Sequence, residues 1–211
     1  MFTEVSFMPI TTAIFDAFGT LLQITAGTRP YRKILQLGIE QGRRPGANDA
    51  EVLMSAPMDL REAADFFGIR VEPILMDQLE AGLHDELARI EAYPDGLAAV
   101  AALQAAGIKV VVCSNLAKPY AAAIKRLYPT LDGYAYSFAI GAIKPSKEIY
   151  KRATQLVRAS PHEAWMVGDS KRCDCDGPTA FGIRGFYLDR QGSGGYRTLR
   201  TFADELLRSR E

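Results

Sequence analysis

The chain contains 211 residues, of which 48% are hydrophobic and 24% are charged. These proportions are typical of a globular protein with one large domain, or with one domain carrying an insertion, and they exclude extensive disorder. The 25 basic and 25 acidic residues balance, so the chain lacks the positive surplus of a protein that binds a nucleic-acid backbone.

The apolar runs and the cysteines indicate whether the chain crosses a membrane and in which compartment it works. The longest apolar runs, such as Ile108 to Cys113, are too short to span a bilayer, so we expect no membrane segment. Three cysteines cannot all pair within one chain, and no histidine cluster accompanies them. We therefore expect reduced thiols and a cytoplasmic location.

Apolar runs that alternate with helix-period stretches predict an α/β fold. The first buried strand covers residues 10–15 and is followed by Asp16 and a turn at Gly19. The other predicted elements of the core are a helix at 96–107, a strand at 108–113, a helix at 118–127, a short strand at 136–140, a helix at 146–157 capped by Ser146, a strand at 164–167, a helix at 173–181, a strand at 184–188 and a closing helix at 198–208. This order predicts a Rossmann-like parallel sheet with helices on both faces.

Residues 22–93 interrupt the alternation. They contain helix-period stretches such as Pro73 to Glu91 but no convincing apolar strand run, and turns are expected at 42–48 and 55–59. We predict an α-helical insertion over 22–93, placed in a core formed by residues 1–21 and 94–211.

The charge of this insertion is divided. Residues 22–46 hold five basic side chains and one acidic side chain, whereas residues 47–93 hold three basic and eleven acidic ones. One interpretation is that these are helix faces in contact with water. The other is that Arg29 or Arg32 supplies positive charge above an active site and binds substrate.

Polar residues follow the predicted strands at the edge where open parallel sheets bind ligands. Asp16, Ser114 and Asp169 each lie at such a strand end, and Lys144 precedes a helix. Asp16 can attack an electrophilic centre and form a covalent intermediate. Lys144 can stabilise the charge that develops on the transferred group.

Two further features of these residues favour a metal and an anionic ligand. The carboxylates of Asp169 and Asp174 are oxygen donors suited to Mg²⁺, which would hold a phosphate oxygen during transfer. The Ser114 side chain and the backbone amides around Asn115 can donate hydrogen bonds to the same group.

Four segments together resemble the motifs of the haloacid dehalogenase-like hydrolase superfamily. They are Phe15–Leu21, Val112–Asn115, Ile143–Pro145 and Val167–Asp174. The resemblance covers most of residues 10–190 and implies that the insertion is a helical cap. It also implies that Asp16 is the nucleophile and a metal ligand, Ser114 the phosphate binder and Lys144 the charge-balancing lysine. Asp169 is then a metal ligand, and Asp174 a ligand or a support for the ligands.

One position departs from the phosphatases of this superfamily. They usually carry a second aspartate two residues after the nucleophile, which protonates the leaving group, whereas this chain has Phe18. The Phe18 backbone carbonyl can still bind the metal. General acid–base help is worth about a hundred- to ten-thousandfold in rate, so a phosphatase without it is expected to be slow.

Three functions therefore stay open. The first is a Mg²⁺-dependent phosphatase acting on a small, anionic phosphorylated metabolite. The second is a metal-independent 2-haloacid dehalogenase, since those enzymes often place an aromatic residue at the position of Phe18 and release halide without a proton. The third is a catalytically weak protein that binds a phosphorylated metabolite. In each case we expect a monomer or a homodimer.

Overall fold

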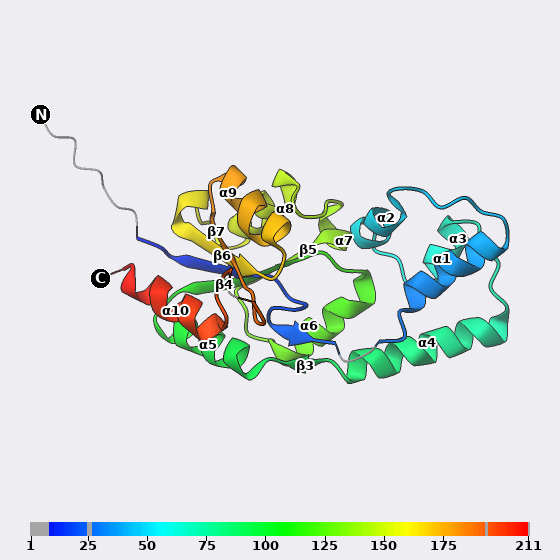
Figure 1. The fold of residues 1–211 in the computed structure, drawn as a ribbon, viewed down its shortest axis with the longest axis horizontal. Helices are drawn as coiled ribbons and strands as arrows, with labels where there is room; N and C mark the ends of the chain where they lie inside the picture. The colour runs from blue at the N-terminus through cyan, green and yellow to red at the C-terminus, as the bar shows by residue number, and fades with distance from the viewer. Residues whose placement is uncertain (1–8, 25–26, 193, 211) are drawn as a thin grey trace, which may run out of the picture.

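A computed structural model describes residues 9–24, 27–192 and 194–210 of the chain. Five parallel strands form its central sheet, in the order β5-β4-β1-β6-β7 (Figure 1). The strands are β1 (Thr12–Phe15), β4 (Lys109–Ser114), β5 (Gly133–Tyr136), β6 (Ala164–Gly168) and β7 (Arg184–Tyr187). The predicted α/β class and parallel sheet are confirmed.

Both faces of the sheet are buried, because the strand side chains alternate between two hydrophobic clusters. In β1, Phe15 packs into the cluster on one face and Ile14 into the cluster on the other. Helices α5 (Pro94–Ala105), α6 (Ala121–Leu127) and α10 (Leu199–Arg208) contribute to the first cluster. Helix α8 (Lys147–Leu156), flanked by α9 (Gly177–Phe181), covers the second face (Figure 1).

Short helical turns complete the core, and one prediction about this part is wrong. Residues 137–140 form α7 (Ser137–Ile140) rather than the end of a strand, and β5 lies just before them. Gly133 at the start of β5 weakens the strand signal, yet a Cβ there would lie 3.0 Å from the Cβ of Leu156, so the helix packs close to the strand. Three further turns are η1 (Lys118–Tyr120), η2 (Pro161–Glu163) and η3 (Lys171–Asp176), the last a π-helix.

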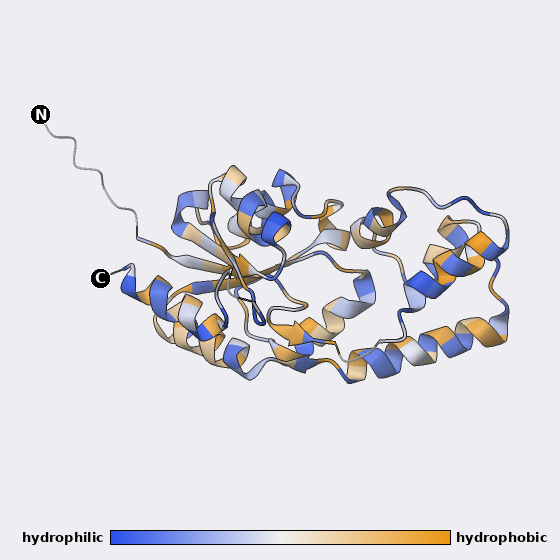
Figure 2. Ribbon diagram, viewed as in Figure 1, coloured by the Kyte–Doolittle hydropathy of each residue, from blue (hydrophilic) through white to orange (hydrophobic). Residues whose placement is uncertain are grey.

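Four helices occupy the part of the chain predicted as helical. They are α1 (Pro30–Glu40), α2 (Asp49–Ser55), α3 (Leu60–Phe66) and α4 (Pro73–Ala88), and we call them together the helical insertion. They project beyond the sheet and share a hydrophobic cluster of their own (Figure 1). Figure 2 shows hydrophobic and hydrophilic residues alternating along α4, as expected of a helix with one buried face.

The two connections to the helical insertion run side by side. They contain the two-residue strands β2 (Leu22–Gln23) and β3 (Glu91–Ala92), which pair in antiparallel fashion although no strand was predicted there. The division into a core (1–21 and 94–211) and a cap (22–93) as folding units stays a prediction. None of the described helices has the length and apolar composition that a bilayer crossing requires.

Replacing Phe202 tests how far stability depends on the first cluster. Its side chain is fully buried, and its ring centroid lies 5.6 Å from that of Phe15 and 5.5 Å from that of Phe186. We expect Phe202→Ala to lower the free energy of unfolding by about 3–5 kcal/mol, measured by urea denaturation. Phe66→Ala is the control, because Phe66 is 62% exposed, and its effect should stay within about 0.5 kcal/mol.

Candidate active site

The register of the sheet brings three predicted site residues to one edge. Phe15 of β1 pairs with Val112 of β4 and Val167 of β6, so these strands end at the same level. Asp16 follows β1 immediately, and its backbone N–H donates to the Val167 carbonyl over 3.0 Å. Ser114 ends β4 and Asp169 follows β6, which places both beside Asp16 at the carboxyl edge.

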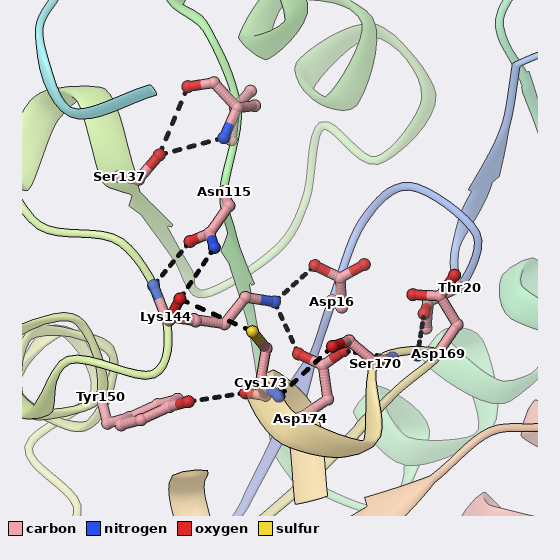
Figure 3. Close-up of polar contacts among 11 residues, drawn as sticks. Asp16, Thr20, Asn115, Ser137, Lys144, Tyr150, Asp169, Ser170, Cys173 and Asp174 are labelled. Atoms are coloured by element: carbon pink, nitrogen blue, oxygen red, sulfur yellow. Dashed lines mark hydrogen bonds and ion pairs between the residues drawn. The ribbon is translucent and has the colours of Figure 1, made fainter. Parts of the chain in front are cut away.

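The side chain of Lys144 lies between two carboxylates at this edge (Figure 3). Its Nζ donates to Oδ1 of Asp16 over 2.6 Å and to Oδ1 of Asp174 over 2.6 Å. All three groups are buried, with side-chain exposures of 3% for Lys144, 9% for Asp16 and 1% for Asp174. One cation thus faces two anions in a site with little water.

Burial and charge act in opposite directions on these groups. Burial lowers the pKa of Lys144, but Asp16 and then Asp174 outweigh it, so the pKa is raised and the lysine stays protonated. For Asp174, burial raises the pKa to about 6; the neighbouring Lys144 opposes this rise and Asp16 adds to it. The charge of Lys144 therefore favours the ionised form of Asp174.

Asn115 holds Lys144 in place. Its Oδ1 accepts from the backbone N–H of Lys144 over 2.7 Å, and its Nδ2 donates to the Lys144 carbonyl over 3.1 Å. One side-chain amide thereby fixes both backbone groups of the lysine. The predicted contact of Asn115 with substrate through its backbone stays a prediction, as does the phosphate-binding role of Ser114, a residue that is 1% exposed.

A glycine and a backbone amide position Asp174. Its Oδ2 accepts from the backbone N–H of Ser170 over 2.9 Å. A Cβ on Gly168 would lie 2.4 Å from the Asp174 carboxyl carbon, so the carboxylate reaches Lys144 only because residue 168 has no side chain. The π-helix η3, which contains Asp174, is a rare conformation that often occurs at functional sites.

The carboxylate cluster fits a divalent cation. Asp16, Asp169 and Asp174 each offer an oxygen, and these oxygens lie within 4.8 Å of one another. Three carboxylates and one lysine leave a surplus of negative charge, and hard oxygen donors are the ligands that Mg²⁺ prefers. Asp169 is the exposed member of the cluster. Partial removal of its carboxylate from water still raises its pKa, and the charge of Asp16 raises it further.

Two features of the loop after β1 bear on this cluster. A Cβ on Gly19, which has φ of +88°, would lie 2.1 Å from Oδ2 of Asp169, so the loop packs tightly against that carboxylate. Within the part of the chain that the structure describes, no group donates a hydrogen bond to the Phe18 carbonyl. That carbonyl as a metal ligand stays a prediction.

A cavity of about 670 Å³ opens between the sheet edge and the helical insertion. Phe18 and Asn115 line it from the core side. Arg29 and Arg32 line it from the insertion side, so both arginines share a cavity with Phe18, two residues after Asp16, and with Asn115, next to Ser114. Their contact with a substrate stays a prediction.

Glu86 and Tyr120 also line this cavity, and the sequence interpretation did not select them. Oε1 of Glu86 accepts from the Tyr120 hydroxyl over 2.7 Å, while Oε2 accepts from the Thr28 hydroxyl over 3.0 Å and from the Arg29 backbone N–H over 3.3 Å. The Tyr120 ring packs edge-on against Phe18, with centroids 5.7 Å apart. Glu86 thus links the helical insertion, through Tyr120, to the loop that follows Asp16.

A signal for Glu86 exists in the pattern of α4. The buried residues of this helix are Met76, Leu79, Leu83 and Glu86, so the glutamate continues the apolar stripe at helical spacing. An acidic residue in an apolar stripe is buried only when other groups satisfy it. A glutamate at such a position therefore predicts a buried, hydrogen-bonded carboxylate, even in a segment that is rich in acidic side chains.

Comparisons with known proteins identify the family and the fold of the chain. The model of a family described as haloacid dehalogenase-like hydrolase matches residues 10–182. The chain belongs to this family. Over 199 residues the hydrolase is 27% identical to (S)-2-haloacid dehalogenase 1 of Pseudomonas sp. (strain CBS-3), with 86% of each chain covered.

Solved structures place the hydrolase in the same fold. A HAD phosphatase from Thermococcus onnurineus matches with a TM-score of 0.66 and 22% identity, covering 95% of this chain and 100% of its own. An L-2-haloacid dehalogenase from Xanthobacter autotrophicus, with chloropropionic acid covalently bound, matches with a TM-score of 0.56 and 21% identity, covering 87% of this chain and 79% of its own. At these identities the likeness extends to the fold alone.

The Glu86 contacts predict a pH-dependent contribution to stability. Burial alone would raise the pKa of Glu86, but the hydrogen bonds from Tyr120, Thr28 and Arg29 outweigh it, so the folded-state pKa lies below the ordinary 4.5. The unfolded state then binds more protons, so the stabilisation is complete above the ordinary pKa and is lost as the pH falls through the folded-state value.

We expect Glu86→Gln to lower the free energy of unfolding at pH 7 by about 1–3 kcal/mol, because an amide cannot accept from all three donors. The difference from the native chain should shrink as the pH falls below 4.5. Denaturation series at several pH values measure this. Glu72→Gln, at an exposed position of the same region, is the control. A difference that stays constant with pH would contradict the assignment.

Proposed function

We propose that this hydrolase is a Mg²⁺-dependent phosphatase that acts on a small anionic phosphate ester through an aspartyl intermediate on Asp16. The observation that carries the proposal is the cluster of Asp16, Asp169 and Asp174, whose oxygens lie within 4.8 Å of one another. Mg²⁺ held by these carboxylates would neutralise the charge of a phosphoryl group during its transfer. We also propose that the protein works in the cytoplasm as a monomer or homodimer, without nucleic acid.

The residues of the site divide the chemistry between them. Lys144 holds Oδ1 of Asp16, which leaves Oδ2 without a described partner and available for attack on phosphorus. The bond from phosphorus to the ester oxygen breaks as the new bond to Asp16 forms. The leaving oxygen takes a proton from water, because Phe18 has none to give. Water then attacks the same phosphorus, and inorganic phosphate leaves Asp16.

A 2-haloacid dehalogenase is the second candidate, and Phe18 favours it. Asp16 would displace halide from carbon, and halide leaves without a proton, so an aromatic side chain at this position costs nothing. Water would then cleave the resulting ester and release the 2-hydroxyacid. The similarity to (S)-2-haloacid dehalogenase 1 supports the same alternative, whereas Asp169 in the carboxylate cluster favours the phosphatase.

A metal and substrate screen separates these functions. We expect release of phosphate from small esters that requires Mg²⁺, stops with a chelator and is abolished in Asp16→Asn. Halide release from a 2-chloroacid in the presence of a chelator would instead establish the dehalogenase. Stoichiometric binding of phosphate esters without turnover of either class would indicate a binding protein.

Calorimetric Mg²⁺ titration gives a readout that does not depend on activity. Asp169→Asn should weaken Mg²⁺ binding about 10- to 100-fold, because a carboxylate ligand becomes a neutral amide. Asp85→Asn, an exposed position on α4, removes the same charge away from the site and should bind Mg²⁺ as the native chain does. Equal affinity in all three proteins would contradict the metal site.

Phe18→Asp tests whether a missing general acid limits the phosphatase. We expect kcat/KM to rise by about a hundredfold or more for alkyl phosphates, whose leaving oxygen needs a proton. For 4-nitrophenyl phosphate, whose leaving group is stable without a proton, the rise should be small. Phe18→Asn is the matched control, because it removes the contact with Tyr120 equally but supplies no proton. A similar gain in both variants would contradict the explanation.

A further inference from the structure

Among the described residues, the cavity between the helical insertion and the sheet edge offers few polar groups that a ligand can use. The described polar side chains that line it are those of Arg29, Tyr31, Arg32, Glu86, Asn115 and Tyr120. Most already have partners within the protein. The Tyr31 hydroxyl donates to the Met58 carbonyl over 2.9 Å, Tyr120 donates to Glu86, and Asn115 holds the backbone of Lys144.

The two arginines are the exception. Among the described residues, neither guanidinium group takes part in a hydrogen bond or an ion pair. Both lie at the amino-terminal end of α1, Arg29 at the N-cap and Arg32 in the first turn. Positive charge is unfavourable there, because the helix dipole places partial positive charge at this end, and the first turn holds no acidic residue to offset it.

The backbone conformation of Arg29 also points to a ligand site. Its φ of 51° lies in the left-handed region, which residues other than glycine rarely adopt. Glu86 helps to hold this conformation by accepting from the Arg29 N–H. Strained residues of this kind persist where the surrounding structure fixes them, and they cluster at ligand sites.

The rest of the cavity wall is apolar. Leu35, Leu53, Met54, Leu116 and Ala117 line it together with Phe18. Its volume of about 670 Å³ is ample for a small molecule, and Phe18 and Asn115 at its wall are near in sequence to Asp16 and Ser114. A sugar would leave several hydroxyl groups without partners in such a space, because the described polar groups other than the two guanidinium groups already have partners in the protein.

We propose that this cavity selects phosphate esters whose leaving group is an apolar body ending in a second anionic group, which Arg29 and Arg32 bind. The inference rests on the proposed phosphatase function and names its substrate class. The phosphoryl group lies at Asp16, the apolar body against the leucine and methionine side chains, and the second anion at the guanidinium groups. Sugar phosphates are poor substrates of this site.

Two esters of equal shape test the selection. The carboxylate of 4-carboxyphenyl phosphate is replaced by a neutral amide in 4-carbamoylphenyl phosphate. We expect kcat/KM to be about 10- to 100-fold higher for the carboxylate, since a charged group gains a charge-assisted hydrogen bond. Arg29→Gln and Arg32→Gln should each move this ratio towards one. Arg44→Gln, which removes the same charge outside the cavity, should leave it unchanged.

A binding measurement separates the inference from the proposed function. The non-hydrolysable pair 4-(phosphonomethyl)benzoate and 4-(phosphonomethyl)benzamide is titrated calorimetrically into the full chain with Mg²⁺. If neither ester is turned over but the benzoate binds more tightly in an arginine-dependent way, the phosphatase function fails and the selection stands. If esters are turned over without preference, or glucose 6-phosphate is turned over as well as the carboxylate ester, the selection is overturned and the phosphatase function stands.

Discussion

The ammonium group of Lys144 lies between the carboxylates of Asp16 and Asp174, and the geometry of the active site depends on that contact. Removing charged groups from water costs on the order of several kcal/mol per ion, so each must be paired and held. The chain meets this requirement with groups from different elements: an amide from Asn115, a backbone N–H from Ser170, and a glycine at 168 that admits the Asp174 carboxylate. The positive charge of Lys144 does not balance the cluster, because Asp16, Asp169 and Asp174 together carry three carboxylates. The remaining negative charge favours binding of a cation at this edge.

Much of this arrangement follows from local sequence. Apolar runs define β1, β4 and β6, and parallel strands must end at one edge, so the sequence alone predicts that Asp16, Ser114 and Asp169 lie together. The alternating burial of Ile14 and Phe15 follows from the same pattern.

Other features depend on contacts between distant segments, which no local pattern encodes. Strand β5 begins with a glycine whose place is explained only by the helix packed on it. Glu86 is buried because Thr28, Arg29 and Tyr120 converge on it from two other segments. The sequence could predict arginines near the site, but not that, among the described polar groups of the cavity, their guanidinium groups are the ones without a partner.

Phe18 does more than replace a general acid, because its side chain also lines the cavity. Its ring contacts Tyr120, whose hydroxyl donates to the carboxylate of Glu86, so Phe18 forms part of the cavity wall as well as following the proposed nucleophile, Asp16, by two residues. An aspartate there would place a polar group in an apolar wall. Phe18 in place of an aspartate is thus consistent with an apolar cavity. Both features would act on the leaving group of the proposed reaction, and not on the group transferred to Asp16.

The pairing of β2 with β3 has a consequence for how such a protein diversifies. Leu22 and Ala92 are neighbours across a two-stranded ladder, so the chain leaves the core and returns to it at nearly the same point. A segment whose ends meet can be shortened, lengthened or exchanged without moving the strands that position Asp16. Recombination at this junction would give the same catalytic edge a different recognition surface, which makes residues 22 and 92 natural points for building chimaeras.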